Sequence, residues 1–534
     1  MKARRTGKEV LIVGAGMAGL TAAAYLSRAG YRVTILEKSG HIGGLVHTFS
    51  REGFHFDTGP RAIGNAGIVK PMAEDLGLDI AFAESPVSTG IADKIVHYRS
   101  LEDIDSFVQS LRELFPDSLP EIERLSRRLW SFSRHSATLN RVANPYFKNL
   151  LHDARYLFTE LIPWLPSFLS ILIKTAGSKK SVEGELAAIS RDQSLNDMVC
   201  QHFFKGTPRE FALGYFYNFL DYLYPKGGTG RLPEALRESS SANGARILLD
   251  AAVTAVDPVK KSLRDGQGRE FRYDALLWAA DLKTLYESCE IGRLPRIIRR
   301  RVLARKEALS HYASAESVFT LFVAVDAPPE DFARVSRGHF IYTPETHGLG
   351  ELHRSTLAGL KKNFNTLAPE TLWSWLAEFC RYNSYEISIP VLKDRSLAPE
   401  GKTGLIVSLM FDGELCMQIH ERGWYGEFKD RTANHMLDAL EGSVYPGLRS
   451  KILFTDTATP YTLRRMFGVR DGAIVGWSLE GSVPVPDRLT RIGASVRTPI
   501  PGVFIAGQWT YSPAGVPVAI LTGRIAAQLI NSKL

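Results

Sequence analysis

A glycine-rich turn between an apolar strand and a helix is the feature that most constrains this chain. Residues 10–13 (VLIV) predict a buried parallel strand, because aliphatic residues run without a polar interruption. The sequence Gly14-Ala15-Gly16-Met17-Ala18-Gly19 follows directly. Residues 20–29 then predict a helix, and residues 31–36 predict a second strand that ends at Glu37-Lys38.

Each glycine of this turn has a physical purpose. Gly14 allows the tight turn, Gly16 lets the backbone approach a pyrophosphate, and Gly19 lets the helix pack closely against the strand. The helix N-terminus offers N–H groups and partial positive charge to phosphates, and Glu37 can accept hydrogen bonds from ribose hydroxyls. We therefore predict a dinucleotide site here.

Composition limits the classes of protein that the chain can belong to. The 534 residues are 45% hydrophobic and 23% charged, which excludes a disordered chain, a collagen and a coiled coil and leaves room for several domains. The net charge of +8 suits an anionic ligand, nucleic acid or an anionic membrane surface, and equally a solvated basic surface. No nucleic-acid recognition module accompanies the charge, so we expect no nucleic-acid partner.

The spacing of the cysteines and the lack of an apolar leader favour a reducing, cytoplasmic setting. The four cysteines show no paired spacing, so we expect no metal site and no disulfide framework (Cys200, Cys289, Cys380 and Cys416). We also expect no signal peptide and no membrane-spanning helix, because neither an apolar leader nor a run of 18 apolar residues is found.

Two later motifs resemble those of the amine-oxidase and phytoene-desaturase superfamily of flavoproteins. Gly43 and Gly44 follow the ribose acid and resemble its second FAD-contacting motif, although Leu45 stands where the family usually has arginine. Residues 53–60 (GFHFDTGP) are similar to its next turn, which places Gly59 and Pro60 beside the flavin ring.

The C-terminal region is similar to the closing motif of the same superfamily. Residues 501–507 predict a strand ending at Gly507, and Gly515-Val516-Pro517 opens a helix over 518–530. The resemblance implies that this helix N-terminus faces the flavin's pyrimidine side. It also implies that Gln508, which replaces the usual acid, binds a ribityl hydroxyl and that the backbone of Val253 contacts the adenine.

The resemblance implies an α/β fold in which a Rossmann-type FAD domain is interleaved with an α+β substrate domain. The FAD domain is expected from residues 1–69, 223–295 and 451–534. A helical, membrane-facing region is expected over 70–222, and a substrate domain with an antiparallel sheet over 296–450. Residues 317–326 and 388–401 add a likeness to the phytoene desaturase, carotenoid isomerase and retinol saturase branch.

That branch implies an FAD-dependent oxidoreductase of an apolar polyene or isoprenoid, acting by desaturation, saturation or redox-assisted isomerisation. With no second dinucleotide fingerprint, quinone or oxygen is the expected electron acceptor. Two alternatives stay open: a soluble amine or porphyrinogen oxidase, and a flavin-free prenyl-binding protein of the Rab-escort and GDI type.

The most apolar stretch is residues 161–173, and three lysines follow it (Lys174, Lys179 and Lys180). At this length and with two prolines, it is too short to cross a bilayer but suits insertion into one anionic leaflet. A buried core helix is the alternative. A second basic cluster runs from Arg293 to Lys306, where lipid contact and a solvated helix face are both open.

No residue declares itself as a catalytic acid or base, as is common where a flavin carries the hydride. Trp509 and Tyr511, between the last strand and the last helix, are candidates for contact with the ring and substrate. Arg61, directly after Gly59-Pro60, is a candidate for polarising the flavin. His339 and Tyr342 are candidates for the substrate tunnel, with a structural role on a strand as the favoured alternative.

Overall fold

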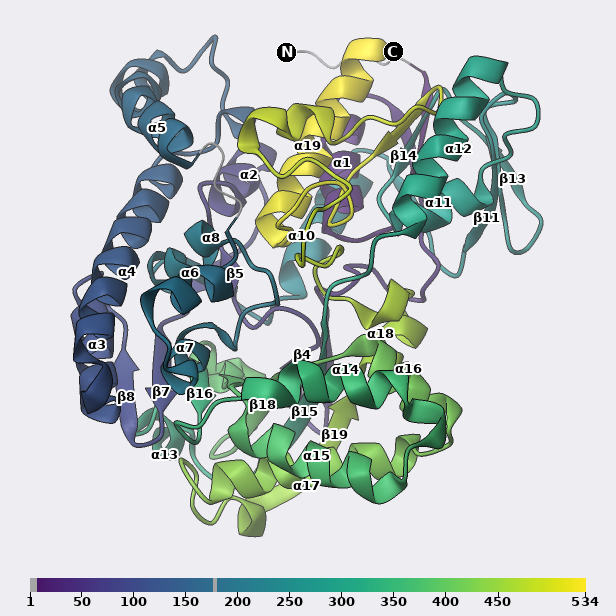
Figure 1. The fold of residues 1–534 in the computed structure, drawn as a ribbon. Helices are drawn as coiled ribbons and strands as arrows, with labels where there is room; N and C mark the ends of the chain where they lie inside the picture. Colours follow the sequence, from purple (N-terminus) through teal and green to yellow (C-terminus); the bar gives the residue numbers. More distant parts are fainter. Residues whose placement is uncertain (1–6, 176–179) are drawn as a thin grey trace.

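The computed structural model describes residues 7–175 and 180–534. The first of its two large sheets is parallel and has five strands (Figure 1). The strand order is β10 (Arg246–Leu248), β2 (Arg32–Leu36), β1 (Glu9–Val13), β14 (Ala275–Trp278) and β20 (Val503–Ile505). Every pairing between neighbours is parallel. The predicted α/β class is therefore confirmed, and three distant parts of the sequence build one sheet.

Both faces of this sheet are covered, which explains the unbroken apolar run of β1. Val10 and Ile12 pack toward α1 (Met17–Arg28), α10 (Arg231–Ala242) and α19 (Val516–Lys533). Leu11 and Val13 pack on the other face, toward α11 (Leu282–Ser288) and α12 (Arg296–Ser310). A three-stranded antiparallel sheet lies beside that second face and consists of β11 (Val253–Asp257), β12 (Ser262–Asp265) and β13 (Glu270–Arg272).

The second large sheet is mixed and has seven strands. Its order is β19 (Ile452–Ala458), β15 (Ser317–Val325), β18 (Thr403–Phe411), β17 (Tyr385–Ser388), β16 (His339–Thr343), β7 (Val87–Ile91) and β8 (Lys94–His97). Only β16 and β7 pair in parallel. The sheet thus includes strands from regions 70–222 and 451–534, beyond the segment 296–450 expected to supply it.

One face of this larger sheet packs on a layer of helices that appears green in Figure 1. They are α14 (Ser355–Lys362), α15 (Pro369–Tyr382), α16 (Gly413–Glu421) and α17 (Tyr425–Glu441). Aromatic residues of the hairpin β3 (Thr48–Arg51) and β4 (Phe54–Asp57) pack on the opposite face, against Phe322 and Ile406. That hairpin packs residues 48–57 onto the seven-stranded sheet, which we call the substrate sheet after the domain predicted to contain it.

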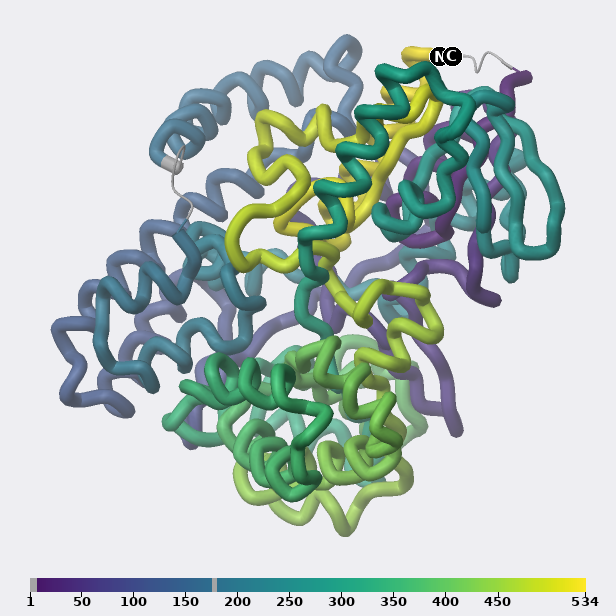
Figure 2. The backbone as a smooth tube through the Cα atoms, turned by 45° about the vertical axis from the view of Figure 1, so that its right-hand side comes forward, coloured from purple at the N-terminus to yellow at the C-terminus, as the bar shows by residue number. Residues whose placement is uncertain are grey.

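A helical region formed by much of residues 70–222 lies along one side of the molecule (Figures 1 and 2). Its helices are α3 (Asp103–Leu114), α4 (Leu119–Asn140), α5 (Ile162–Thr175), α6 (Val182–Ile189), α7 (Gln193–Cys200), α8 (Arg209–Leu213) and α9 (Tyr215–Asn218). The remaining helices are α2 (Val69–Leu76), α13 (Pro329–Ala333) and α18 (Pro460–Phe467), and a small sheet joins β5 (Ile63–Gly64), β9 (Tyr222–Pro225) and β6 (Phe82–Glu84).

Candidate flavin site and substrate cavity

The glycine turn after β1 has the close packing that its sequence predicts. Gly14 has φ +100°, and a Cβ there would lie 2.7 Å from the carbonyl oxygen of Ala279. A Cβ on Gly19 would lie 2.0 Å from the carbonyl oxygen of Gly14. Gly16, by contrast, has no atom within 4 Å of its Cβ position, and as N-cap of α1 it offers no side chain to the first turn of the helix. Open space in front of free helix N–H groups is the arrangement that a pyrophosphate requires.

The acid at the end of β2 turns back over this loop. Glu37 is 8% exposed, and its Oε2 accepts a hydrogen bond from the backbone N–H of Ala15 at 2.7 Å. Its Oε1 accepts bonds from the N–H and hydroxyl of Ser39, both at 2.9 Å. The N–H of Ala251 donates to the carbonyl of Glu37, so the start of β11 at Val253 lies near the predicted ribose site. Lys38 points the other way, toward Gly468.

The second glycine motif lies directly against the first. Gly43 forms a β-bridge with Gly16, and its N–H donates to the carbonyl of Ala15 at 2.8 Å. A Cβ on Gly59 would lie 1.8 Å from the carbonyl oxygen of Leu45, so the Gly59-Pro60 turn packs on the segment after the glycine pair. The departure from the family's arginine at Leu45 therefore leaves this backbone contact intact.

Asp57 holds that turn in place, and sequence reasoning did not single it out. Its Oδ1 accepts hydrogen bonds from Thr48 Oγ1 (2.7 Å) and from the N–H and hydroxyl of Thr229, and its Oδ2 accepts one from the Tyr224 hydroxyl at 2.6 Å. Both carboxylate oxygens are thus used by protein donors. Its position three residues before Pro60 was the available signal.

The closing motif meets the glycine loop at the N-termini of two helices. Gly507 has φ +104°, and its Cβ position is 3.5 Å from Ala18 Cβ. Its N–H donates to Thr522 Oγ1 of α19 at 3.0 Å. Gly515 caps α19, which begins at Val516-Pro517, and Gln508 lies beside Gly476. The structure therefore brings the predicted cofactor residues from both ends of the chain to one edge of the parallel sheet.

The three catalytic candidates have different surroundings. Trp509 packs edge-on against Trp477 with ring centroids 4.9 Å apart, and Tyr511 is buried but lines a cavity. Arg61 is 3% exposed and donates through Nη1 to the carbonyl of Asp57 (2.8 Å) and through Nη2 to Ser408 Oγ (2.6 Å). Burial lowers the pKa of its guanidinium, which the nearby Glu386 and Asp57 oppose. The catalytic roles of these three residues stay predictions.

A cluster of charged side chains surrounds Arg61, and sequence reasoning missed two members: Lys393, which is buried, and Glu386, which is partly accessible. Lys393 Nζ donates to the carbonyl of Arg61 (2.7 Å) and to Ser388 Oγ (2.8 Å). Burial lowers the pKa of Lys393 to about 7, against the opposing charges of Asp57 and Glu386. Glu386 lies 3.1 Å from Nε2 of His339. Charged residues within the otherwise apolar strand and loop of 385–393 were the sequence signal.

The two tunnel candidates differ in placement. His339 is 3% exposed and stacks on Tyr222 with centroids 5.4 Å apart. Tyr342 is buried in the core under the helical layer, and its hydroxyl donates to the carbonyl of Ala92 at 3.2 Å. His339 therefore belongs to the buried polar cluster, whereas Tyr342 packs as a structural residue.

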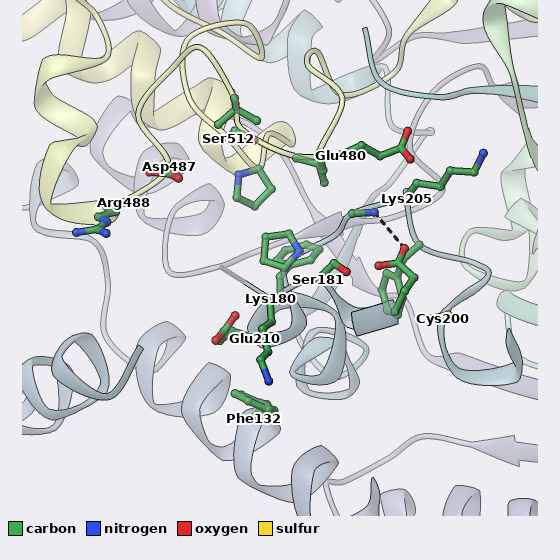
Figure 3. Close-up of a pocket in the computed structure, with 18 of the residues that line it drawn as sticks. Phe132, Lys180, Ser181, Cys200, Lys205, Glu210, Glu480, Asp487, Arg488 and Ser512 are labelled. Carbon is green, nitrogen blue, oxygen red and sulfur yellow. Dashed lines mark hydrogen bonds between the residues drawn. The ribbon is translucent and has the colours of Figure 1, made fainter. Parts of the chain in front are cut away.

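A cavity of about 1000 Å³ lies between the helical region and the C-terminal loop (Figure 3). Phe132 of α4 and Ser512 of the closing motif lie on opposite sides of it. Many of its walls are apolar, including Leu139, Leu169, Ile171, Leu172, Ile173, Phe203, Phe211, Leu349 and Leu479. Because Tyr511, Ser512 and Pro513 also line it, the cavity reaches the motif predicted to hold the flavin.

The apolar helix of the sequence prediction borders this cavity and is longer than predicted. A π-helical turn, Tyr156–Leu161, precedes α5, and Pro166 lies inside α5. Within the described residues, Tyr156–Lys174 is long and apolar enough to cross a membrane by length and composition, so the length argument used to expect no membrane-spanning helix fails for this segment. The difference arises because residues 156–160, which precede the apolar run, continue the helix.

Much of this helix is exposed, including Leu169 and Ile173, which also line the cavity. Only 17% of the segment Tyr156–Lys174 is buried, and Leu169 and Ile173 are 54% and 75% exposed. Its other side is tied to α4, since Trp164 Nε1 donates to the carbonyl of Thr138 at 2.6 Å. The alternative of a buried core helix is therefore excluded. Of the lysines predicted beside it, Lys180 lines the cavity and Lys179 lies outside the described residues.

The second basic cluster is divided in the structure. Arg293 pairs with Asp257, and Arg305 donates to the carbonyl of Pro484 at 2.6 Å. The other members are exposed on α12 and form no ion pair with any residue described (Arg296, Arg299, Arg300, Arg301 and Lys306). In Figures 1 and 2, α12 and α5 are well separated. No group of three or more metal-ligating side chains occurs in the described part of the chain.

A parallel sheet with two glycine motifs and a closing helix at one edge defines a dinucleotide-binding oxidoreductase fold. The sequence profile of the flavin containing amine oxidoreductase family matches residues 17–531, and the chain belongs to this family. It is thereby a flavin-dependent oxidoreductase. The open space at Gly16 and the free N–H groups of α1 fit the pyrophosphate of such a cofactor.

Curated relatives cover nearly the whole chain at low identity. Prolycopene isomerase 1, chloroplastic, of an Oncidium hybrid cultivar is 23% identical over 98% of this chain and 84% of the relative. All-trans-retinol 13,14-reductase of Danio rerio is 22% identical over 94% and 82%. The zeta-carotene-forming phytoene desaturase of Myxococcus xanthus is 24% identical over 99% and 95%.

Solved structures share the fold. A putrescine oxidase variant superposes with a TM-score of 0.60 at 14% identity, over 99% of both chains. Cyclohexylamine oxidase from Brevibacterium oxydans IH-35A gives 0.56 at 14% identity, also over 99% of both chains. These likenesses establish the architecture and not the substrate.

Proposed function

We propose that this protein is an FAD-dependent oxidoreductase that desaturates, saturates or isomerises a carbon–carbon bond of an apolar polyene or isoprenoid. The observation that carries the proposal is the cavity of about 1000 Å³, which extends from the exposed apolar helix α5 to Tyr511-Ser512-Pro513. A long apolar substrate needs an apolar passage between a lipid phase and the reacting ring. The names of the curated relatives support this substrate class.

FAD is the form of flavin that the site fits, because two glycine motifs and a ribose acid suit a dinucleotide. Gly14, Gly16, Gly19 and the first turn of α1 would hold the pyrophosphate, and Glu37 would bind the ribose. Bound flavin supplies a hydride acceptor or donor at N5. The walls of the cavity position the substrate and exclude water.

We further propose that the protein lies on the cytoplasmic side of a membrane and inserts α5 into one leaflet. Leu169 and Ile173 would enter the hydrocarbon, and Lys174 and Lys180 would meet anionic headgroups. The attachment of α5 to α4 through Trp164 favours a helix that lies in the leaflet over one that crosses it. Quinone or oxygen is the proposed electron acceptor.

The two alternative functions receive less support. A soluble amine or porphyrinogen oxidase gives no reason for the exposed apolar face of α5. A flavin-free prenyl carrier gives no reason for the open, glycine-lined space at Gly16. The family match favours a flavoprotein over such a carrier.

The proposal is tested by product analysis. FAD-loaded protein is incubated with a carotenoid or retinoid series in anionic liposomes, under oxidising and reducing conditions, and the polyenes are separated by chromatography. We expect a product with two hydrogens fewer or more, or with altered double-bond geometry. Turnover of amines with no change in any polyene would instead establish the amine-oxidase alternative.

A further inference from the structure

Glu386 is an accessible carboxylate on a central strand of the substrate sheet. Its strand, β17, pairs with β18 on one side and β16 on the other. Side chains on central strands are ordinarily buried between layers, yet 44% of the Glu386 side chain is accessible. It lies on the sheet face that the helices α14–α17 do not cover, where the sheet meets the cofactor domain.

The sheet register places Glu386 next to the predicted flavin turn. Thr320 pairs with Ser408, and Ser408 pairs with Glu386, so these three side chains form one row on the same face of the sheet. Arg61, the residue after Pro60, donates hydrogen bonds to the first two members of that row. Glu386 therefore lies in this row beside Ser408, which Arg61 connects to the Gly59-Pro60 turn.

The hydrogen bonds of Glu386 leave one oxygen free. Oε1 lies 3.1 Å from Nε2 of His339, whose Nδ1 is buried without a partner. With a proton on Nε2, His339 donates a hydrogen bond to Oε1 of Glu386. No hydrogen bond to Oε2 is made by any residue that the structure describes, so this oxygen of the partly accessible side chain has no protein donor.

The charges around Glu386 keep it ionised. Burial favours the neutral acid, but the hydrogen bond and charge of His339, followed by the charges of Arg61 and Lys393, lower the pKa of Glu386 to about 2. The other titratable groups that face it are His202, Tyr215 and Tyr222. The ionised carboxylate has a free oxygen that can take up a proton, and its low pKa makes it a weak base that returns the proton readily to solvent.

We propose that Glu386 is the proton acceptor of a desaturation reaction, an inference that rests on the proposed function and assigns it a direction. The substrate loses a hydride from an allylic carbon to the oxidised flavin. The C–H bond of the adjacent carbon breaks, its proton passes to Oε2 of Glu386, and its electron pair becomes the second bond of the new alkene. Glu386 then returns the proton to solvent.

The test compares Glu386→Gln, which has the same shape but is not a base, with Glu386→Asp and with Glu378→Gln as a matched control. Glu378 is exposed on α15, outside the polar cluster. Flavin reduction by a polyene is followed anaerobically by stopped-flow absorbance, and polyene binding is measured separately. We expect Glu386→Gln to bind flavin and polyene normally but to reduce flavin about 100-fold more slowly or worse, and Glu386→Asp to recover part of the rate.

A second readout needs no turnover. In flavin-free protein, nitrogen NMR of His339 reports its titration, and Glu386→Gln should shift that titration to lower pH because the carboxylate raises the pKa of His339. An unchanged His339 titration, or Glu386→Gln reducing flavin at the wild-type rate, overturns the proposal and leaves the proposed function standing. Failure of every polyene to reduce wild-type flavin also overturns the proposal; the proposed function falls only if no polyene is converted with reduced flavin either.

Discussion

Arg61 Nη2 donates a hydrogen bond to Ser408 Oγ at 2.6 Å, joining the predicted flavin turn to the substrate sheet. The same guanidinium also donates to Thr320 Oγ1 and to the carbonyls of Asp57 and Gly59. One buried side chain thus fixes how the two halves of the protein meet. Any disturbance of it changes both stability and the position of the turn.

Replacement of Arg61 by methionine leaves several buried acceptors without a donor. We expect the free energy of unfolding to fall by about 3 kcal/mol, because each unsatisfied buried group is costly. Arg61→Lys keeps the charge but lacks the forked donors, so it should recover only part of the loss. Urea denaturation measures both. Unchanged stability of Arg61→Met together with lost flavin reduction would show a catalytic role instead.

Two glycines of the first turn should respond differently to alanine. Gly16→Ala places a methyl group where no protein atom lies, so folding should be unaffected. It should nevertheless weaken flavin binding about tenfold or more, because the methyl group occupies space that the pyrophosphate needs. Gly19→Ala creates a contact of 2.0 Å with the backbone of Gly14 and should lower thermal stability as well.

Flavin titration and thermal melting, measured on both variants, separate these effects. Normal flavin affinity in Gly16→Ala would show that the cofactor does not lie against this loop.

The exposed face of α5 is expected to control membrane binding. Ile173→Glu should weaken cosedimentation with anionic liposomes about tenfold, because it replaces a buried aliphatic group in the leaflet with a charge. Ile297→Glu is the matched control, since Ile297 is 65% exposed but lies on α12. Flavin content should be normal in both variants. Equal loss of liposome binding in both would favour general electrostatic attraction over insertion of α5.

Lys393 should make stability depend on pH. Its pKa in the folded protein is lowered to about 7 from an ordinary value of 10.5, so between these values the unfolded chain binds the proton that the folded protein does not. Below pH 7 the folded protein must bury a charged Lys393, which lowers its stability. Between pH 7 and 10.5 the free energy of unfolding of the wild type should rise by on the order of 1 kcal/mol per pH unit. Lys393→Met should lack this rise.

Urea denaturation at pH 6 to 10 measures the difference between wild type and variant, with the exposed Lys260→Met as control. A difference that does not change with pH would contradict a neutral, buried Lys393.

Local motifs explain which parts of the site were predictable from sequence. The residues from Gly14 to Glu37 act through spacing along one strand, turn and helix, so the sequence alone placed them correctly at one edge of the sheet. The length of the apolar helix was underestimated because the π-helical turn Tyr156–Leu161 extends it ahead of the apolar run.

The polar cluster was not predictable for a different reason. Arg61, Glu386 and Lys393 meet only through the register of strands far apart in the sequence. The same holds for β7, which joins the seven-stranded sheet by pairing with β16, about 250 residues away, and carries its neighbour β8 with it. Pairing partners of this kind are not encoded in local periodicity.

The central claim is tested most directly by the visible absorbance spectrum of the purified protein, recorded anaerobically before and after addition of a polyene in liposomes. The account predicts a flavin spectrum whose long-wavelength band bleaches on addition of a polyene that can be desaturated. A colourless protein that cannot be reconstituted with FAD, or a flavin that amines bleach and polyenes do not, would contradict it.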